Sequence, residues 1–247
     1  MPNVLITGCS SGFGLETARY FLDRNWTVVA TMRHPRADLL PPSASLRVLA
    51  LDVTNPASIE AAVTEAGEID VLVNNAGIGW LNALEGTPMT AARELFETNT
   101  LGLIAMTQGV LPQMRERRAG VIINVSSSVT LGPLPLLSVY TASKAAVNAF
   151  TEVLALELEQ FGIRARLVLP GRGPETSFGD NARARMTSGF PDAYADIGQR
   201  VFAAFQSAGP VTHLSDVAEA VWRAATDPTC PLRLPAGADA IAASQTR

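Results

Sequence analysis

The chain has few of the residues that mark disulfide-held, metal-binding or nucleic-acid-binding proteins. Its 247 residues include two cysteines, Cys9 and Cys230, and two histidines, His34 and His213. The cysteines lie far apart and match no metal-ligand spacing, so we expect no metal and a reduced, cytoplasmic setting. The formal net charge of -4 gives no reason to expect a nucleic acid or an anionic membrane as a partner. No apolar run of spanning length precedes the first predicted strand, so we expect no membrane partner.

The chain is instead rich in apolar segments, with 47% hydrophobic and 17% charged residues. Near-continuous apolar runs, typical of strands buried on both faces, alternate with helical patterns. The predicted strands are residues 4–7, 27–31, 46–51, 71–73, 121–125 and 166–169. The predicted helices are residues 14–24, 57–66, 90–117 and 139–161. The alternation predicts an α/β fold: a doubly wound, Rossmann-type parallel sheet of about seven strands with helices on both faces, forming a single domain over residues 1–247.

One long segment, residues 172–210, fits no strand–helix unit but carries several aromatic residues. An insertion after the C-terminal end of a strand is where a doubly wound fold places a ligand lid. We therefore predict a substrate-binding lid here, although packing of the same side chains against the sheet is the alternative for about half of them. The predicted substrate pocket, suited to a bulky apolar ketone, aldehyde or alcohol, comprises Trp80, Leu134, Leu137, Phe178, Met186, Phe190 and Tyr194.

A glycine-rich turn joins the first predicted strand to the first predicted helix. Glycines allow a tight turn and close approach to a pyrophosphate, and the helix start offers free N–H groups to that anion. An ordinary turn is the alternative, but the position between strand and helix favours a nucleotide site. The predicted cofactor contacts in this turn are Gly8, Ser10, Ser11, Gly12, Phe13 and Gly14.

Three further strand ends supply candidate cofactor contacts. No carboxylate stands near Met32, where an NAD-selective site would place one, and Arg33 follows directly. A guanidinium there can bind a 2′-phosphate, which predicts NADP(H) preference; a solvated surface arginine is the alternative. Asp52 and Val53 end the third strand near the expected adenine. Asn75, Ala76 and Gly77 end the fourth, where small residues permit close approach to a flat ligand, although a capping role is equally open.

Tyr140 and Lys144 stand four residues apart in a predicted helix, so both lie on one face. A neighbouring lysine favours the phenolate, which predicts a tyrosine pKa lowered from about 10 and a side chain able to exchange a proton with an alcohol oxygen. Ser127 follows an apolar strand and could reach the same oxygen, or could simply cap the strand. Asn99 lies within a helical pattern that disfavours asparagine, and either water binding or a local kink would explain it.

In their order and spacing these motifs resemble the short-chain dehydrogenase/reductase family in its compact single-domain form. Thr7-Gly-Cys-Ser-Ser11 and the C-terminal residues 231–240 are most similar to the branch of 17β-hydroxysteroid and retinol dehydrogenases and carbonyl reductases. The resemblance implies that Tyr140 is the catalytic acid or base and that Ser127 holds the substrate oxygen. It also implies that Lys144 binds the nicotinamide ribose and lowers the Tyr140 pKa, and that Asn99 holds a relay water.

The resemblance further implies that Pro170, Gly171 and Thr176 contact the cofactor. The segment from Pro170 to Thr176 is one residue longer than the usual Pro-Gly-x-Val-x-Thr, which leaves the register of Thr176 open. A homodimer or homotetramer is the family expectation. The alternative functions are a 3-oxoacyl-thioester reductase, a non-catalytic NADP(H)-sensing protein and a structural or interaction protein.

Overall fold

Seven parallel strands form one sheet in the computed structural model, which describes residues 1–186, 189–206 and 209–245. Their order across the sheet is β3-β2-β1-β4-β5-β6-β7. The strands are β1 (Asn3–Thr7), β2 (Thr27–Met32), β3 (Leu46–Ala50), β4 (Val71–Asn74), β5 (Gly120–Val125), β6 (Ile163–Pro170) and β7 (Arg233–Ala236). The reversal of strand order beside β1 is the arrangement of a doubly wound fold, so the predicted fold class is confirmed.

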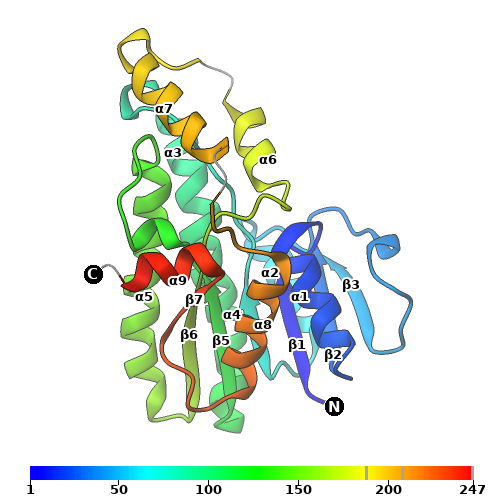
Figure 1. Cartoon of the computed structure of the whole chain (residues 1–247). Coiled ribbons are helices and arrows are strands. Elements are labelled where there is room, and N and C mark those ends of the chain that lie inside the picture. Colours follow the sequence, from blue (N-terminus) through cyan, green and yellow to red (C-terminus); the bar gives the residue numbers. More distant parts are fainter. Residues whose placement is uncertain (187–188, 207–208, 246–247) are drawn as a thin grey trace.

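Helices cover both faces of the sheet (Figure 1). The α-helices of the described ranges are α1 (Gly12–Leu22), α2 (Pro56–Ala66), α3 (Met89–Phe96), α4 (Gly102–Arg117), α5 (Ser138–Glu159), α6 (Phe178–Arg185), α7 (Ala195–Gln206), α8 (Leu214–Thr226) and α9 (Ala238–Gln245). Short helical turns are η1 (Ala37–Leu39), η2 (Leu84–Gly86), η3 (Glu97–Leu101), η4 (Ser128–Thr130) and η5 (Asp192–Tyr194). Within these ranges, no helix combines the length and the apolar character needed to cross a bilayer.

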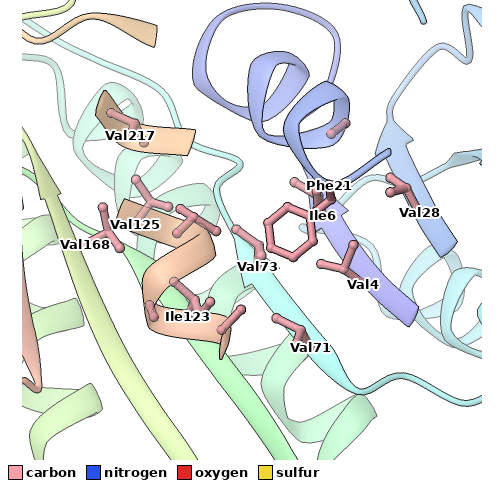
Figure 2. Packing of buried hydrophobic residues seen from close by; sticks show 14 of the residues in the cluster. Val4, Ile6, Phe21, Val28, Val71, Val73, Ile123, Val125, Val168 and Val217 are labelled. Carbon is pink, nitrogen blue, oxygen red and sulfur yellow. The ribbon is translucent and has the colours of Figure 1, made fainter. Parts of the chain in front are cut away.

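The alternation of side chains along each strand divides the core into two layers. Val4 and Ile6 of β1 point to the face covered by α1 and α8, where they pack with Phe21 and Val217 (Figure 2). Leu5, between them, points to the opposite face and packs with residues of α2, α4 and α5. All three β1 side chains are fully buried. Burial on both faces explains why the strands read as continuous apolar runs.

The last strand, like α8 and α9, is an element that the sequence predictions did not locate. β7 is four residues long and contains Pro235, which cannot donate a ladder hydrogen bond. It lies at the edge of the sheet beside β6, the position where a strand proline is tolerated. A short, proline-containing edge strand carries little of the apolar pattern that marks central strands.

The predicted helix over residues 90–117 is interrupted by a wider turn. α3 and α4 are joined by η3, a π-helical turn that contains Asn99. A π turn inserts one extra residue and displaces the backbone, which is frequent at functional sites. The local disturbance expected from an asparagine at this position is therefore present as a π turn.

Candidate active site

The glycine-rich turn after β1 has a backbone that only glycine adopts easily. Gly8 and Gly12 have φ angles of 75° and 57°, in the left-handed region. A side chain at Gly14 would meet Asn75 Nδ2 and the Gly8 carbonyl oxygen, each 2.4 Å from its Cβ. The turn can therefore fold back tightly against the end of β4, which leaves its outer side open to the cleft.

Partly buried hydrogen bonds join this turn to the loop after β4. Thr7 Oγ1 accepts from the backbone N–H groups of Asn75 (3.0 Å) and Ala76 (2.9 Å). In return, Asn75 Nδ2 donates to the carbonyl oxygens of Thr7 (2.9 Å) and Gly8 (3.2 Å). The side chain of Asn75 thus holds the glycine turn in place, while Ala76 and Gly77 line the cleft.

The start of α1 offers hydrogen-bond donors to an anion. Ser11, the residue before the helix, makes no side-chain cap hydrogen bond. The first N–H groups of α1 are thus left for a ligand, and the helix dipole is positive there. Cys9 points away from the cleft into the core, and burial raises the pKa of its thiol to about 12. The open turn and the uncapped helix start fit the pyrophosphate of a dinucleotide.

Arg33 and Asp52 lie at the far end of the same cleft. Arg33 is exposed after β2. Asp52 accepts hydrogen bonds from Thr54, through its backbone N–H (2.9 Å) and its hydroxyl (2.7 Å). These bonds, more than the charge of Arg33, lower the pKa of the Asp52 carboxyl. Val53 also lines this end of the cleft.

The Tyr140 side chain is buried at the first turn of α5 and is hydrogen-bonded to Ser127. Burial raises the pKa of the Tyr140 phenol to about 12, and the Ser127 hydrogen bond only partly opposes this shift. The predicted lowering of this pKa by Lys144 is therefore wrong for the protein without a bound cofactor, because loss of hydration disfavours the phenolate. At neutral pH the phenol is protonated and can act as a proton donor.

Lys144 lies one turn further along α5, as its spacing predicted, and is also buried. Its Nζ donates to the carbonyl oxygen of Val125 at 2.9 Å. Burial lowers the pKa of its ammonium group to about 8. A Cβ added to Gly77 would lie 3.5 Å from this Nζ and 3.2 Å from Asn99 Oδ1, so Gly77 keeps the space beside both groups open.

Asn99 is fully buried behind the cleft rather than in its wall. Its side chain exchanges two hydrogen bonds with the backbone of Ile78: Oδ1 accepts from the N–H (2.8 Å) and Nδ2 donates to the carbonyl oxygen (3.0 Å). Asn99 Nδ2 also donates to Ser143 Oγ (3.1 Å), which itself donates to the Tyr140 carbonyl oxygen (2.7 Å). The side chain therefore fixes the turn of α5 that carries Tyr140.

The segment after β6 brings Thr176 against the glycine turn despite its extra residue. A Cβ added to Gly12 would lie 3.2 Å from Thr176 Cβ, and one added to Gly173 would lie 2.6 Å from Phe13 Cζ. Thr176 Oγ1 donates to the Gly173 carbonyl oxygen at 2.8 Å, so the additional residue is taken up by a local turn. Pro170, Gly171 and Thr176 all line the cleft.

These groups surround one cleft of about 1030 Å³. Its walls include all the predicted cofactor contacts except Gly14, which is buried behind the turn, and also include Ser127, Tyr140 and Lys144. Of the predicted substrate pocket, five residues line the cleft: Trp80, Leu134, Leu137, Phe178 and Met186. The Phe178 ring lies 5.8 Å from that of Tyr140, which places the pocket beside the candidate acid.

Two predicted pocket residues lie elsewhere, which corrects the pocket prediction for them. Phe190 packs edge-on against Phe202, with ring centroids 5.8 Å apart. Tyr194 is hydrogen-bonded to Glu85 on the outer side of the molecule. In the described part of the chain, neither lines the cleft, while Phe202 and Phe205 do. Residues 187–188 and 207–208 of the predicted lid lie outside the described residues.

Residues 2–186 match the short chain dehydrogenase family. The chain belongs to the short-chain dehydrogenase/reductase family. A 3-ketodihydrosphingosine reductase of Bacteroides thetaiotaomicron is 40% identical over 197 residues, which cover 78% of this chain and 71% of the relative. Retinol dehydrogenase 8 of Bos taurus is 42% identical over 180 residues, which cover 68% of this chain and 58% of the relative, so less than two thirds of its length is matched. A closed serine dehydrogenase solved with NADP+ is 31% identical, with a TM-score of 0.81 and coverage of 95% of this chain and 94% of that one.

Several residues that support this short-chain dehydrogenase/reductase site were not predicted from the sequence. Thr212 and Asp239, from the last third of the chain, hold the segment after β6 through side-chain hydrogen bonds. Ser143 and Thr100 join α5 to the π turn, since Thr100 Oγ1 donates to the Ser143 carbonyl oxygen at 3.0 Å. A serine inside the Tyr-x-x-x-Lys motif was the available signal for Ser143.

Proposed function

We propose that the chain is an NADP(H)-dependent oxidoreductase that interconverts a bulky apolar ketone or aldehyde and the corresponding alcohol. The observation that carries the proposal is the convergence of the Tyr140 phenol, the Ser127 hydroxyl and the Lys144 amine at a cleft with a glycine-rich turn. A bound dinucleotide would supply the hydride for the carbonyl carbon. The residues of the chain would supply position and a proton.

Tyr140 is the proposed proton donor to the carbonyl oxygen in reduction and the acceptor in oxidation. Its high pKa keeps the proton on the phenol at neutral pH, as the reduction direction requires. Ser127 would hydrogen-bond the same oxygen and the phenolate left behind. Lys144 in its charged form would stabilise that phenolate, and burial already brings the pKa of its ammonium group to about 8, close to working pH.

NADP(H) preference is proposed from Arg33. Its guanidinium is exposed at the ribose end of the cleft, where a 2′-phosphate would accept charge-assisted hydrogen bonds. The NADP+ held by the similar serine dehydrogenase supports a dinucleotide of this kind. Asp52 is held by Thr54, so its carboxylate is already engaged beside the proposed adenine.

An apolar substrate is proposed from the wall beside Tyr140. Trp80, Leu137, Phe178 and Phe205 offer an apolar lining, and the segment 172–210 that contributes two of them is the proposed lid. The retinoid and sphingoid names of the relatives also support an apolar carbonyl compound.

The test follows the absorbance of NADPH in the presence of apolar ketones and aldehydes of increasing size. We expect oxidation of NADPH with at least one bulky member, and none with the same compounds in the Tyr140→Phe variant. Binding of NADPH without turnover across the panel would support a sensing protein and overturn the proposal. Preference for an acetoacetyl thioester would instead favour the acyl-thioester reductase.

We also propose a homodimer or homotetramer formed through α4 and α5. Leu156 and Val153 of α5 expose 73% and 56% of their surface, and Leu101 before α4 exposes 49%. Apolar side chains grouped on long helices are typical of helix pairing between subunits. Light scattering measures the molar mass of the wild type and of Leu156→Glu in solution. The variant should have the mass of a smaller assembly, and a mass equal to that of the wild type would contradict the interface.

A further inference from the structure

Four residues far apart in the sequence meet at the base of the proposed lid, and we call them the clasp: Gly171, Arg172, Thr212 and Asp239. Gly171 and Arg172 follow β6, Thr212 precedes α8, and Asp239 lies in the first turn of α9. The clasp therefore closes the chain segment between residues 172 and 212 at a single point. That point is also a wall of the cleft, because Gly171, Arg172 and Asp239 line it.

Side-chain hydrogen bonds hold the clasp. The Arg172 backbone N–H donates to Asp239 Oδ2 (2.6 Å), and the Gly171 N–H donates to Thr212 Oγ1 (2.9 Å). Thr212 Oγ1 lies 2.7 Å from Asp239 Oδ1 and 2.9 Å from the Ala236 carbonyl oxygen, either of which can accept its proton. The Thr212 backbone N–H donates to the Arg172 carbonyl oxygen (2.8 Å). Thr212 is fully buried, so its hydroxyl depends on these partners.

The surrounding glycines show that close approach is required here. A Cβ at Gly171 would lie 2.1 Å from both carboxylate oxygens of Asp239, and one at Gly237 would lie 2.1 Å from Thr212 Oγ1. Gly237 also has a φ of 95°. The chain thus has glycine at the two positions where a side chain would push Asp239 or Thr212 away from the loop.

The clasp fixes the position of the residues that follow Arg172, which lie against the glycine turn. Gly173 follows Arg172 directly, and a Cβ added to it would lie 2.6 Å from Phe13 Cζ. Thr176, four residues after Arg172, lies so near Gly12 that a Cβ added to this glycine would be 3.2 Å from Thr176 Cβ. The position of the Arg172 backbone therefore sets the distance between these residues and the turn proposed to hold the pyrophosphate. We propose that Thr212 and Asp239 are positioning residues, which fix the Gly171–Arg172 backbone so that Thr176 can close over the cofactor. The inference rests on the proposed function for the identity of the ligand.

The test compares conservative variants of the full chain, with NADPH as the ligand. Thr212→Val keeps the shape but loses the hydroxyl, whereas Thr212→Ser keeps the hydroxyl. Asp239→Asn loses one of the two acceptors. We expect Thr212→Val and Asp239→Asn each to weaken NADPH binding about tenfold in calorimetry, and Thr212→Ser to stay within about twofold of the wild type.

A matched control separates positioning from general stability. Asp227 also accepts hydrogen bonds, from the backbone N–H (2.8 Å) and hydroxyl (2.6 Å) of Thr229 and from Arg223 Nε (3.4 Å), but it lies at the far end of α8, away from the cleft. Asp227→Asn should leave NADPH affinity within about twofold even if its melting temperature falls as far as that of Asp239→Asn. Equal loss of NADPH affinity in both aspartate variants would overturn the inference.

Amide hydrogen exchange without cofactor gives a second readout. We expect exchange of the Gly171 and Arg172 amides to be about tenfold faster in Thr212→Val and unchanged in Thr212→Ser, with β1 and β5 unaffected. Wild-type NADPH affinity in Thr212→Val, or equal loss in Thr212→Val and Thr212→Ser, would overturn the inference and leave the proposed function standing. If the wild type binds neither NADPH nor NADH, the proposed function fails and exchange alone decides whether the clasp holds the loop.

Discussion

The two ends of the cleft are held in different ways. At the glycine turn, the buried side chain of Thr7 and the half-buried side chain of Asn75 hydrogen-bond to backbone groups across β1 and β4. At the proposed lid, α6 is joined to α3 by an ion pair between Arg185 and Glu94, whose side chains are 26% and 55% exposed. Buried hydrogen bonds between neutral groups respond little to salt, whereas exposed ion pairs are weak and screened.

This difference indicates that the end of the cleft at the glycine turn is preformed, whereas the end at the proposed lid is adjustable. A turn fixed by several partly buried hydrogen bonds to the backbone keeps one shape and can receive a ligand of fixed shape, such as a dinucleotide, with little reorganisation. A helix held by an exposed ion pair can shift at small cost in free energy, and this suits substrates of varied size. Substitutions at the preformed end should therefore act strongly on turnover and cofactor affinity, and those at the lid weakly on the substrate KM.

The largest effect is expected at Tyr140. Tyr140→Phe removes the proposed proton donor and keeps the ring, so turnover should fall about 10³-fold while NADPH affinity stays within about twofold. Single-turnover kinetics and calorimetry measure the two quantities separately. Phe178→Leu, which changes the neighbouring ring without removing an acid, should raise KM instead. Turnover of Tyr140→Phe near the wild-type rate would contradict the assigned acid.

Lys144→Met should weaken NADPH binding about 10- to 100-fold, because a charged donor to the ligand is lost. The same variant should be more stable at pH 7, by about 2 kcal/mol, since a buried ammonium is removed. Burial lowers the pKa of this group from 10.5 to about 8. Between these values the unfolded chain binds more protons, so the free energy of unfolding of the wild type should rise with pH.

Denaturant unfolding from pH 7 to 8.5 measures this rise, which Lys144→Met should lack. Cys9 and Tyr140 act with the opposite sign, because burial raises the pKa of each and the folded chain keeps its proton longer. Their windows, between pH 9 and about 12 for Cys9 and between pH 10 and about 12 for Tyr140, lie above the measured range. A flat wild-type profile would show that Lys144 is not the titrating group.

Arg33→Gln should weaken NADPH binding about tenfold and leave NADH binding unchanged, because only the 2′-phosphate would lose a partner. Arg36→Gln is the control, since Arg36 is exposed nearby but pairs with Asp38. Calorimetry with both dinucleotides gives the ratio of the NADPH and NADH dissociation constants for each variant. An equal loss for NADPH and NADH would contradict the proposed phosphate contact.

The predicted site residues that the structure brings together at one cleft are those whose partners are close along the chain or belong to strand ends. Tyr140 and Lys144 share a helix face by their spacing alone, and parallel strands bring Gly8, Asn75 and Ser127 to one edge of the sheet. The Tyr140 pKa was predicted with the wrong sign, because spacing reports a neighbouring charge but not the burial that outweighs it. Phe190 and Tyr194 were misplaced because an aromatic in an insertion has no preferred direction.

The clasp illustrates what the sequence alone could not provide. Arg172 and Asp239 are 67 residues apart, and Gly171 and Thr212 are 41 apart. Neither pair has a repeat, a strand register or a helix face that relates its members. Their contact depends on how α8 and α9 return to the end of β6, and β7, the strand between them, was itself hidden by its length and its proline.

The smallest effect is expected at the lid. Arg185→Gln removes the ion pair with Glu94 and should raise the substrate KM about twofold to threefold at low salt, with turnover and NADPH affinity unchanged. High salt should raise the wild-type KM by a similar factor and leave the variant unaffected, because screening removes the same interaction. Arg183→Gln, which disrupts only an exposed pair within α6, should resemble the wild type. A salt response that persists in Arg185→Gln would place the adjustable contact elsewhere, and a change in NADPH affinity would show that the two ends are coupled.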